Sequence, residues 1–262
     1  MESSTTTIRP EGQRSMLKFS CAPMERVRIG FIGVGARGQR AVERMMNIEG
    51  AEVVALCDFI DENIVASCEI VNKYGGAQPA TYLGEAGWRA LCESEEIDLV
   101  YISTDWLSHA EISIYAMEHD KHIALEVPAA MSVEDCWRLV DTSERTQRHC
   151  MMLENCCYDR NEMMVMRMVR EGIFGRIVHC EGGYQHDLRE EISMGAENRH
   201  YRLRNYLARN CENYPTHELG PIAKLLNINR GNRMLYMSSI SSDSFGMEQY
   251  VEDRRGTINP EL

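Results

Sequence analysis

The chain has 262 residues, and its 28 Lys and Arg stand against 40 Asp and Glu, which gives a formal net charge of −12. With 44% apolar residues and only seven prolines it can bury a hydrophobic core, so wholesale disorder is excluded. The acidic balance also argues against nucleic acids and anionic membranes as partners, because both require a basic surface.

Ten cysteines are scattered through the sequence without a C-x-x-C spacing, which predicts free thiols and no metal site. Free thiols are typical of a reducing compartment. The first 26 residues lack the apolar core of a secretory signal, and no run of 18 apolar residues predicts a membrane span. We therefore expect a cytoplasmic protein, with export as the alternative if the sequence begins inside a longer one.

Apolar periodicity predicts alternating strands and helices in the first part of the chain. The strands are expected at residues 27–33, 52–58, 98–104, 122–128 and 151–155, and the helices at 35–48, 61–75, 108–119 and 132–147. Ser132 opens the last of these helices, with Asp135 three residues on, which is typical of an N-cap. This alternation predicts an α/β fold, a doubly wound parallel sheet of the Rossmann type.

The rhythm changes near residue 155. A helix is expected over 160–171, then a long segment of alternating apolar residues over 175–189, and a helix over 215–228. We therefore divide the chain into an N-terminal extension (1–26), a dinucleotide-binding domain (27–155) and a second α/β domain (156–262). The second domain is expected to carry an open mixed or antiparallel sheet and looks short, as if truncated.

A glycine-rich loop follows the first predicted strand and opens a helix. Gly33, Gly35 and Gly38 form a G-x-G-x-x-G string, whose glycines allow a tight turn, close approach of a pyrophosphate and close helix–strand packing. Asp58 ends the next strand 20 residues after Gly38, where a carboxylate would accept hydrogen bonds from a ribose and repel a 2′-phosphate. The pattern predicts NAD as the cofactor in preference to NADP; the alternative is a set of simple turn glycines.

The segment of Glu126, Val127 and Pro128 resembles the Glu-Lys-Pro motif of the Gfo/Idh/MocA oxidoreductases, with Val127 in place of the lysine. The string E-V-P-A-A from Glu126 is similar to one branch, glycoside hydrolase family 109, the NAD-dependent α-N-acetylgalactosaminidases. W-L-S-H from Trp106 and Y-P-T-H-E-L-G-P from Tyr214 resemble further motifs of that branch.

The resemblance implies roles for individual residues. NAD contacts are implied for Ala36, Arg37, Asp58, Trp106, His109, Glu126, Val127 and Asn155, which join Gly33, Gly35 and Gly38 of the glycine string. Sugar contacts are implied for Tyr184, Arg202, Tyr214, Pro215, Thr216 and His217. Because Tyr and His side chains can serve as base or acid, His217, Tyr184 and His186 are the candidates for catalysis. The alternative for Trp106 and His109 is simple packing at the start of a helix. Glu154 and Asp187 fit either a carboxylate pair or ordinary salt-bridged side chains.

The implied reaction is hydrolysis of an α-N-acetylgalactosaminide through transient oxidation at C3, elimination, water addition and re-reduction, without net consumption of NAD. A first alternative is an NAD-linked sugar or cyclitol dehydrogenase of the Gfo/Idh/MocA type. Val127 disfavours it, because an aliphatic side chain can neither donate a proton nor stabilise an alkoxide. A second alternative is a non-catalytic paralogue that binds NAD and sugar. The partner is expected to be a small carbohydrate or glycan, and the resemblance adds a homodimer.

Overall fold

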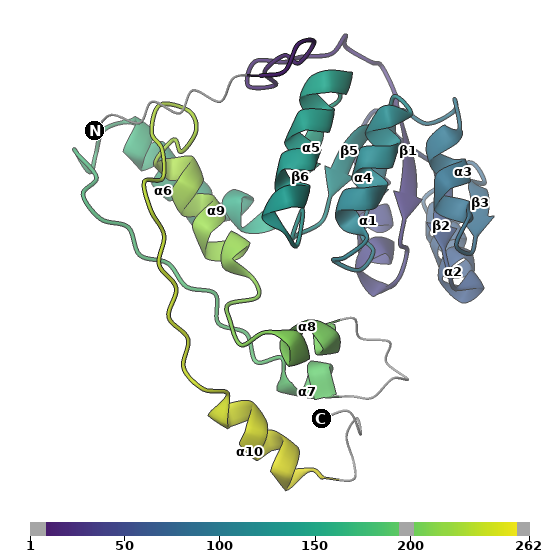
Figure 1. The fold of residues 1–262 in the computed structure, drawn as a ribbon. Coiled ribbons are helices and arrows are strands. Elements are labelled where there is room, and N and C mark those ends of the chain that lie inside the picture. The colour runs from purple at the N-terminus through teal and green to yellow at the C-terminus, as the bar shows by residue number, and fades with distance from the viewer. Residues whose placement is uncertain (1–8, 194–201, 256–262) are drawn as a thin grey trace. The chain divides into compact units, whose positions relative to one another are not determined.

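The computed structural model describes residues 9–193 and 202–255 and divides the chain into two compact units, Met1–Leu153 and Glu154–Leu262. The first unit contains one six-stranded sheet in the order β3-β2-β1-β4-β5-β6, and all neighbouring strands are parallel (Figure 1). Its strands are β1 (Val27–Ile32), β2 (Ala51–Asp58), β3 (Ala80–Leu83), β4 (Leu99–Ile102), β5 (His122–Leu125) and β6 (Cys150–Met152). This order confirms the predicted doubly wound fold.

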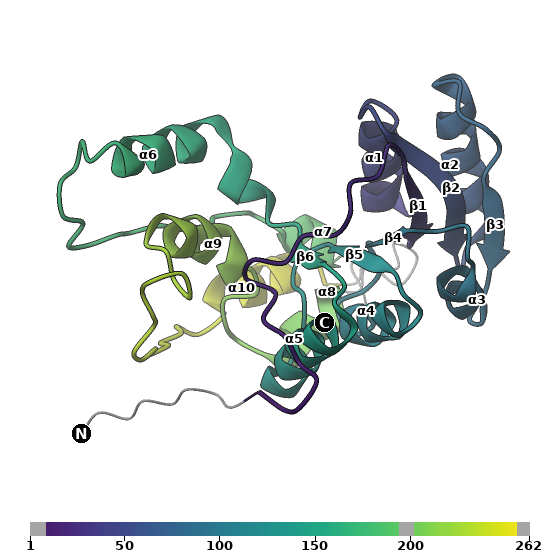
Figure 2. The ribbon, with the colours of Figure 1, turned by 90° about the horizontal axis from the view of Figure 1, so that it is seen from above.

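Helices cover both faces of this sheet (Figure 2). The first unit's helices are α1 (Ala36–Met45), α2 (Asp61–Lys73), α3 (Gly87–Glu93), α4 (His109–Glu118) and α5 (Val133–Thr146). One core cluster around Phe31 and Val42 lies beneath α1 and α2, and a second around Leu91 and Ile112 lies beneath α3, α4 and α5. Two apolar layers explain why the central strands are apolar on both sides.

The predicted cap of α5 is present. The backbone N–H of Asp135 donates to Ser132 Oγ over 3.0 Å, and the Ser132 hydroxyl donates to the Asp135 carboxylate over 2.8 Å. Strand β3 and helix α3 were not predicted. Only four residues long and largely exposed, β3 lies at the sheet edge and carries no apolar pattern that could reveal it.

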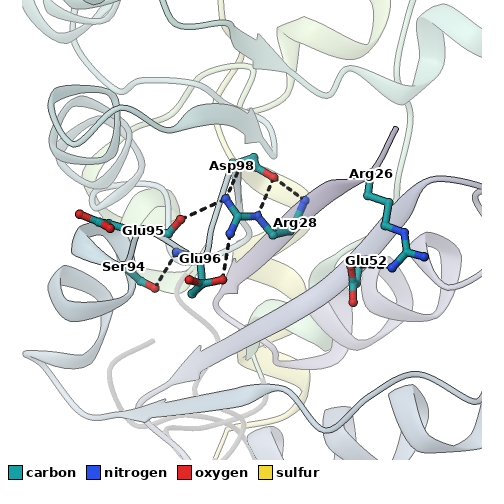
Figure 3. A network of polar contacts seen from close by, with 7 residues as sticks. All are labelled: Arg26, Arg28, Glu52, Ser94, Glu95, Glu96 and Asp98. Carbon is teal, nitrogen blue, oxygen red and sulfur yellow. Dashed lines mark hydrogen bonds and ion pairs between the residues drawn. The ribbon is translucent and has the colours of Figure 1, made fainter. Parts of the chain in front are cut away.

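An ion-pair network ties the start of β1 to the segment before β4 (Figure 3). Arg28 donates from its backbone N–H and its guanidinium to the Asp98 carboxylate over 2.8–3.1 Å, and from Nη1 to Glu96 over 2.9 Å. The Arg28 guanidinium lowers the pKa of Asp98 below its usual range. The network lies at the opposite end of the strands from the glycine-rich loop. Its role is therefore to stabilise the fold, and it takes no part in the site at the loop.

The N-terminal extension packs against α5 and the segment that follows it. Arg9 donates to the Glu144 carboxylate over 2.7 Å, and the backbone N–H of Arg14 donates to the carbonyl of the same residue. The ring of Phe19 lies 4.8 Å from that of His149. Residues 9–19 therefore belong structurally to the first unit.

The second unit consists of helices and extended segments. Its helices are η1 (Asn155–Tyr158, a 3₁₀ turn), α6 (Arg160–Arg170), α7 (Arg189–Ser193), α8 (Arg202–Ala208), α9 (Pro215–Leu225) and α10 (Phe245–Asp253). Helices α6 and α9 confirm the two predicted helices, whereas α7, α8 and α10 were not predicted. Helix α9 packs against η1 and α6.

The sheet predicted for the second domain is not formed by the residues that the structure describes. Residues 177–188 form no regular secondary structure, and Val178 is 90% exposed. The prediction of a strand there is corrected for a physical reason: alternation indicates a residue's preference, but a strand exists only when a neighbour pairs its N–H and C=O groups. Within 202–255 the one bridge is an isolated pair, Ile228 with Asn232.

All ten cysteines are free thiols, as the sequence predicts. Burial raises the pKa of Cys57 and of Cys92 to about 12. Among the described residues, every helix is too short or too polar to cross a membrane.

Candidate active site

The glycine-rich loop joins β1 to α1 at the carboxyl end of the sheet. Gly33 has φ +84°, and a Cβ there would lie 2.7 Å from the Ser103 carbonyl oxygen, while a Cβ at Gly38 would lie 2.2 Å from the Gly33 carbonyl oxygen. A Cβ at Gly35, by contrast, would meet nothing closer than Asn63 Nδ2 at 3.9 Å. The fold itself thus requires the first and third glycines, whereas Gly35 leaves space in front of the α1 N-terminus, where an anion binds well.

Asp58, the last residue of β2, holds this loop. Its Oδ2 accepts a hydrogen bond from the Val34 N–H over 2.8 Å, and its Oδ1 accepts from the Ile60 N–H over 3.0 Å. Asn63 Nδ2 donates to Oδ1 over 3.3 Å. A fixed carboxylate therefore stands at the end of the second strand, as predicted.

Glu126 follows β5 and is 7% exposed. Its carboxylate accepts hydrogen bonds from the Tyr101 hydroxyl over 2.6 Å and from Arg37 Nε and Nη2 over 2.9 and 3.0 Å. Burial, reinforced by the Glu126 charge, raises the pKa of Tyr101 far above its ordinary value. Two of the predicted NAD contacts, Arg37 and Glu126, are thus paired with each other in this structure.

Trp106 lies just before α4 and is 2% exposed, and His109 is the first residue of α4 and is 1% exposed. The His109 ring lies between two backbone carbonyls, with Nδ1 2.8 Å from the Pro128 oxygen and Nε2 3.2 Å from the Thr104 oxygen. Burial lowers the pKa of His109. Its contacts fit the packing interpretation: His109 links the loop after β4 to the Glu126–Pro128 segment.

In the second unit a buried carboxylate meets His217. Glu154, 4% exposed, caps η1, and its Oε1 accepts from the Cys156 N–H over 3.0 Å. The same oxygen lies 2.7 Å from His217 Nδ1, in the first turn of α9. Pro215 at the start of α9 favours the helix beginning there.

Two tyrosines surround His217. The Tyr214 ring stacks on His217 at 5.2 Å and 4° between planes, and the Tyr184 ring lies 4.5 Å from the imidazole. Tyr184 also shares a hydrogen bond of 3.1 Å with His186 Nδ1. Arg202 Nε donates to the Tyr214 hydroxyl over 2.6 Å, and its guanidinium also pairs with Glu191. These contacts bring together every predicted catalytic residue.

The path of the backbone explains how Tyr184 reaches this cluster. A Cβ at Gly182 would lie 3.2 Å from Ile222 Cδ1 and 3.3 Å from Glu218 Cβ, both on α9. The extended segment therefore runs close along the helix that carries His217. Burial raises the pKa of Tyr184, which keeps its hydroxyl protonated near neutral pH.

Family models match both units. The model described as the oxidoreductase family with an NAD-binding Rossmann fold, Gfo/Idh/MocA, matches residues 27–154, and that of the glycosyl hydrolase 109 C-terminal domain matches residues 158–262. The chain belongs to glycoside hydrolase family 109. Its first unit is accordingly an NAD-binding Rossmann domain, as the sequence predicts.

Individual relatives agree with this family. The chain is 45% identical over 258 residues to an alpha-N-acetylgalactosaminidase of Bacteroides fragilis, which covers 97% of this chain and 61% of the relative. It is 47% identical over 252 residues to glycosyl hydrolase family 109 protein 2 of Phocaeicola vulgatus, covering 94% and 61%. The chain thus spans about three fifths of the length of these curated relatives.

Among solved structures, myo-inositol 2-dehydrogenase from Lactobacillus plantarum matches with a TM-score of 0.51 and 22% identity. The match covers 58% of this chain and 43% of that one. At this identity the likeness shows the fold alone.

Within this family 109 chain, the remaining predicted residues occupy varied positions. Asn155 is exposed at the start of η1, Val127 is half-buried, and Thr216 is half-buried with its hydroxyl lacking a hydrogen-bond partner among described residues. Asp187 is exposed and paired with Arg189 over 2.6 Å, so it forms no carboxylate pair with Glu154. The contact of Glu154 with His217 was missed, because 63 residues separate the two and no spacing rule joins them.

Three possible ligand atoms of Glu154, Cys156 and His217 lie within 4.8 Å of one another. The arrangement is poorly suited to bind a metal ion, because the Glu154 carboxylate and the His217 imidazole are already hydrogen-bonded to each other. Burial and the adjacent Glu154 charge also raise the pKa of the Cys156 thiol to about 11, which disfavours the thiolate that a metal requires.

Proposed function

We propose that this protein is an NAD-dependent glycosidase that hydrolyses α-N-acetylgalactosaminides. The observation that carries the proposal is the cluster of Tyr184, Tyr214 and His217, held by Arg202 and Glu154 in the unit that matches the family 109 C-terminal model. The name of the Bacteroides fragilis relative supports the choice of sugar.

The first unit fits the cofactor. Gly35 leaves space at the N-terminus of α1, the helix end that stabilises a phosphate, and the Asp58 carboxylate suits an unphosphorylated ribose. We propose that Gly33, Gly35, Ala36, Arg37, Gly38, Asp58 and Glu126 form this site. Bound NAD would supply a reversible hydride acceptor at the sugar C3. A ketone at C3 would acidify the C2 proton, and restoring the C3 hydroxyl would leave the net reaction hydrolytic.

The second unit would move the protons. The reaction needs bases for the C3 hydroxyl and the C2 proton, and an acid for the leaving oxygen. The His217 imidazole suits a base, because its Nδ1 is engaged by Glu154 and Nε2 has no hydrogen-bond partner among the residues described. Tyr184 can act as the acid, because its hydroxyl is protonated at neutral pH and its ring lies against His217. His186, bonded to that hydroxyl, would relay its proton.

Partner and location follow the same proposal. The family 109 match supports a small carbohydrate or glycan as the partner, and the net charge of −12 disfavours nucleic acid and anionic membranes. Ten free thiols support a cytoplasmic or otherwise reducing compartment. We also propose that the chain forms a homodimer, and sedimentation equilibrium would measure the mass of the assembly.

The experiment is to incubate the purified chain with an aryl α-N-acetylgalactosaminide, with and without NAD, while following aryl alcohol release and NADH absorbance together. We expect release that requires NAD and no accumulation of NADH. Stoichiometric NADH would instead indicate a sugar dehydrogenase, and silence in both channels despite NAD binding would indicate a non-catalytic protein.

A further inference from the structure

We propose that Glu154 is a positioning residue that fixes the tautomer and orientation of His217, so that Nε2 is the nitrogen that accepts a proton. The inference rests on the proposed function, because it assigns His217 the role of base. It gives Glu154 a role different from the carboxylate pair with Asp187 that was weighed in the sequence analysis.

The first observation is the geometry of the pair. Glu154 Oε1 lies 2.7 Å from His217 Nδ1, and the two side chains are only 5% and 9% exposed. A carboxylate with no proton can only accept a hydrogen bond, so Nδ1 must carry the hydrogen. In a neutral imidazole the lone pair then resides on Nε2, which makes that nitrogen the base.

The second observation is that both partners are held in place. The backbone N–H of Cys156 donates to the oxygen of Glu154 that faces His217, and the Tyr214 ring stacks on the imidazole at 4° between planes. A flip of the imidazole would break its hydrogen bond to Glu154, and any smaller rotation would also break the stacking. The tautomer is therefore set by a rigid environment, as catalytic histidines require.

The third observation is the space that α9 provides. A Cβ at Gly220 would lie 2.7 Å from Glu154 Cγ and 3.2 Å from Cys157 Sγ. Gly220 and His217 are three residues apart and so lie on the same side of the helix. Helix α9 thus carries both His217 and Gly220, and the missing side chain of Gly220 leaves the space that Glu154 occupies.

The fourth observation concerns charge. Glu154 Oε2 is buried without a hydrogen-bond partner among the residues described. An uncompensated buried carboxylate is unfavourable. Protonation of His217 would compensate it, so Glu154 would stabilise the imidazolium that forms when His217 takes a proton, as carboxylates do in catalytic triads.

The test compares wild type with Glu154→Gln, Glu154→Asp and the control Glu171→Gln, which removes an exposed carboxylate on the surface near α6. Long-range ¹H–¹⁵N NMR spectra of the full chain report which nitrogen of His217 carries the hydrogen, with His217→Gln used for assignment. Aryl α-N-acetylgalactosaminide turnover with NAD is measured on the same samples.

We expect the Nδ1–H tautomer in wild type and in Glu171→Gln. Glu154→Gln should shift it toward Nε2–H, because the Gln amide can donate to Nδ1, and should lower kcat about 10²-fold to 10⁴-fold. Glu154→Asp keeps the carboxylate, so it should retain part of the Nδ1–H tautomer and part of the wild-type kcat.

An unchanged tautomer in Glu154→Gln, or a shifted tautomer with wild-type turnover, overturns the proposal. If wild type itself shows no turnover, the proposed glycosidase function fails. The NMR comparison still decides whether Glu154 sets the tautomer.

Discussion

Arg37 and Glu126, 89 residues apart in the sequence, form a two-point ion pair in which Nε and Nη2 donate to different carboxylate oxygens. The Tyr101 hydroxyl adds a third donor to the same carboxylate. The pair connects the helix after the glycine-rich loop to the segment after β5, and both carry residues of the proposed cofactor site.

Glu126→Gln should therefore destabilise the first unit. The Gln amide nitrogen would face donors from Arg37 and Tyr101, which leaves buried groups unpaired at a cost of about 1–3 kcal/mol. Urea denaturation followed by circular dichroism measures the change. The control is Glu111→Gln, whose exposed pair with Arg89 should contribute within about 0.5 kcal/mol. Equal effects of the two variants would show that the Glu126 network adds nothing to stability.

Gly35 and Gly38 should respond in opposite ways to an added side chain. Gly35→Val meets open space in the protein, so the fold should survive, while NAD affinity falls at least about tenfold, or 1.4 kcal/mol. Gly38→Ala should instead destabilise the fold by about 1–3 kcal/mol, because its Cβ clashes with backbone. Calorimetric NAD titration and thermal melting separate the two effects. Normal NAD affinity in Gly35→Val would rule out the assigned pyrophosphate site.

Asp58 should determine the choice between the two nicotinamide dinucleotides. Asp58→Asn removes the charge that would repel a 2′-phosphate while keeping an acceptor for the Val34 N–H. We expect NAD affinity to fall and the ratio of NADP to NAD affinity to rise by about tenfold, or 1.4 kcal/mol. Fluorescence titration with both reduced cofactors measures the ratio. A ratio equal to that of wild type would contradict the assignment.

Buried His109 should make the stability of the first unit dependent on pH. Burial lowers its pKa in the folded state, so the unfolded chain binds the proton more readily. The free energy of unfolding should thus decrease as pH falls below the ordinary histidine pKa of about 6.5, with a limiting slope of about 1.4 kcal/mol per pH unit for one proton. His109→Gln should flatten this dependence. Urea melts between pH 5 and 8 test it, and an unaltered slope would exclude His109 as the source.

His217→Ala should separate chemistry from cofactor binding. The imidazole contacts Glu154, Tyr184 and Tyr214, all in the second unit, so NAD affinity should stay at the wild-type value. Turnover of the aryl glycoside should fall by about 10²–10⁴-fold. Retained turnover would remove His217 from the mechanism, whereas equal loss of binding and turnover would indicate a structural role.

The parts of the fold that were predictable from sequence are those encoded locally. The Ser132 cap, the glycine-rich loop and the apolar strands each carry their signal within a few residues, and all are present. Edge strand β3 was missed because it buries little, and the strand expected within 175–189 failed because pairing depends on a distant partner.

The candidate site divides in the same way. The Y-P-T-H string from Tyr214 is local and was recognised, and its resemblance to known enzymes gave His217 its proposed role. The partner that sets its tautomer was not visible, because Glu154 comes near it only through the packing of η1 against α9. Likewise the burial of Trp106 and His109 was not visible in the sequence, because burial is a property of the folded chain.

The free thiols differ in exposure, so the exposed cysteines of this chain can be labelled selectively with fluorophores. Cys136 on α5 and Cys211 after α8 are exposed, one in each unit, whereas Cys57 and Cys92 are buried with pKa values raised to about 12. A maleimide reagent attacks accessible thiolates first. Two fluorophores on the exposed pair, with Cys21 replaced by serine, would then follow the distance between the units as NAD is added, while every buried cysteine stays in place.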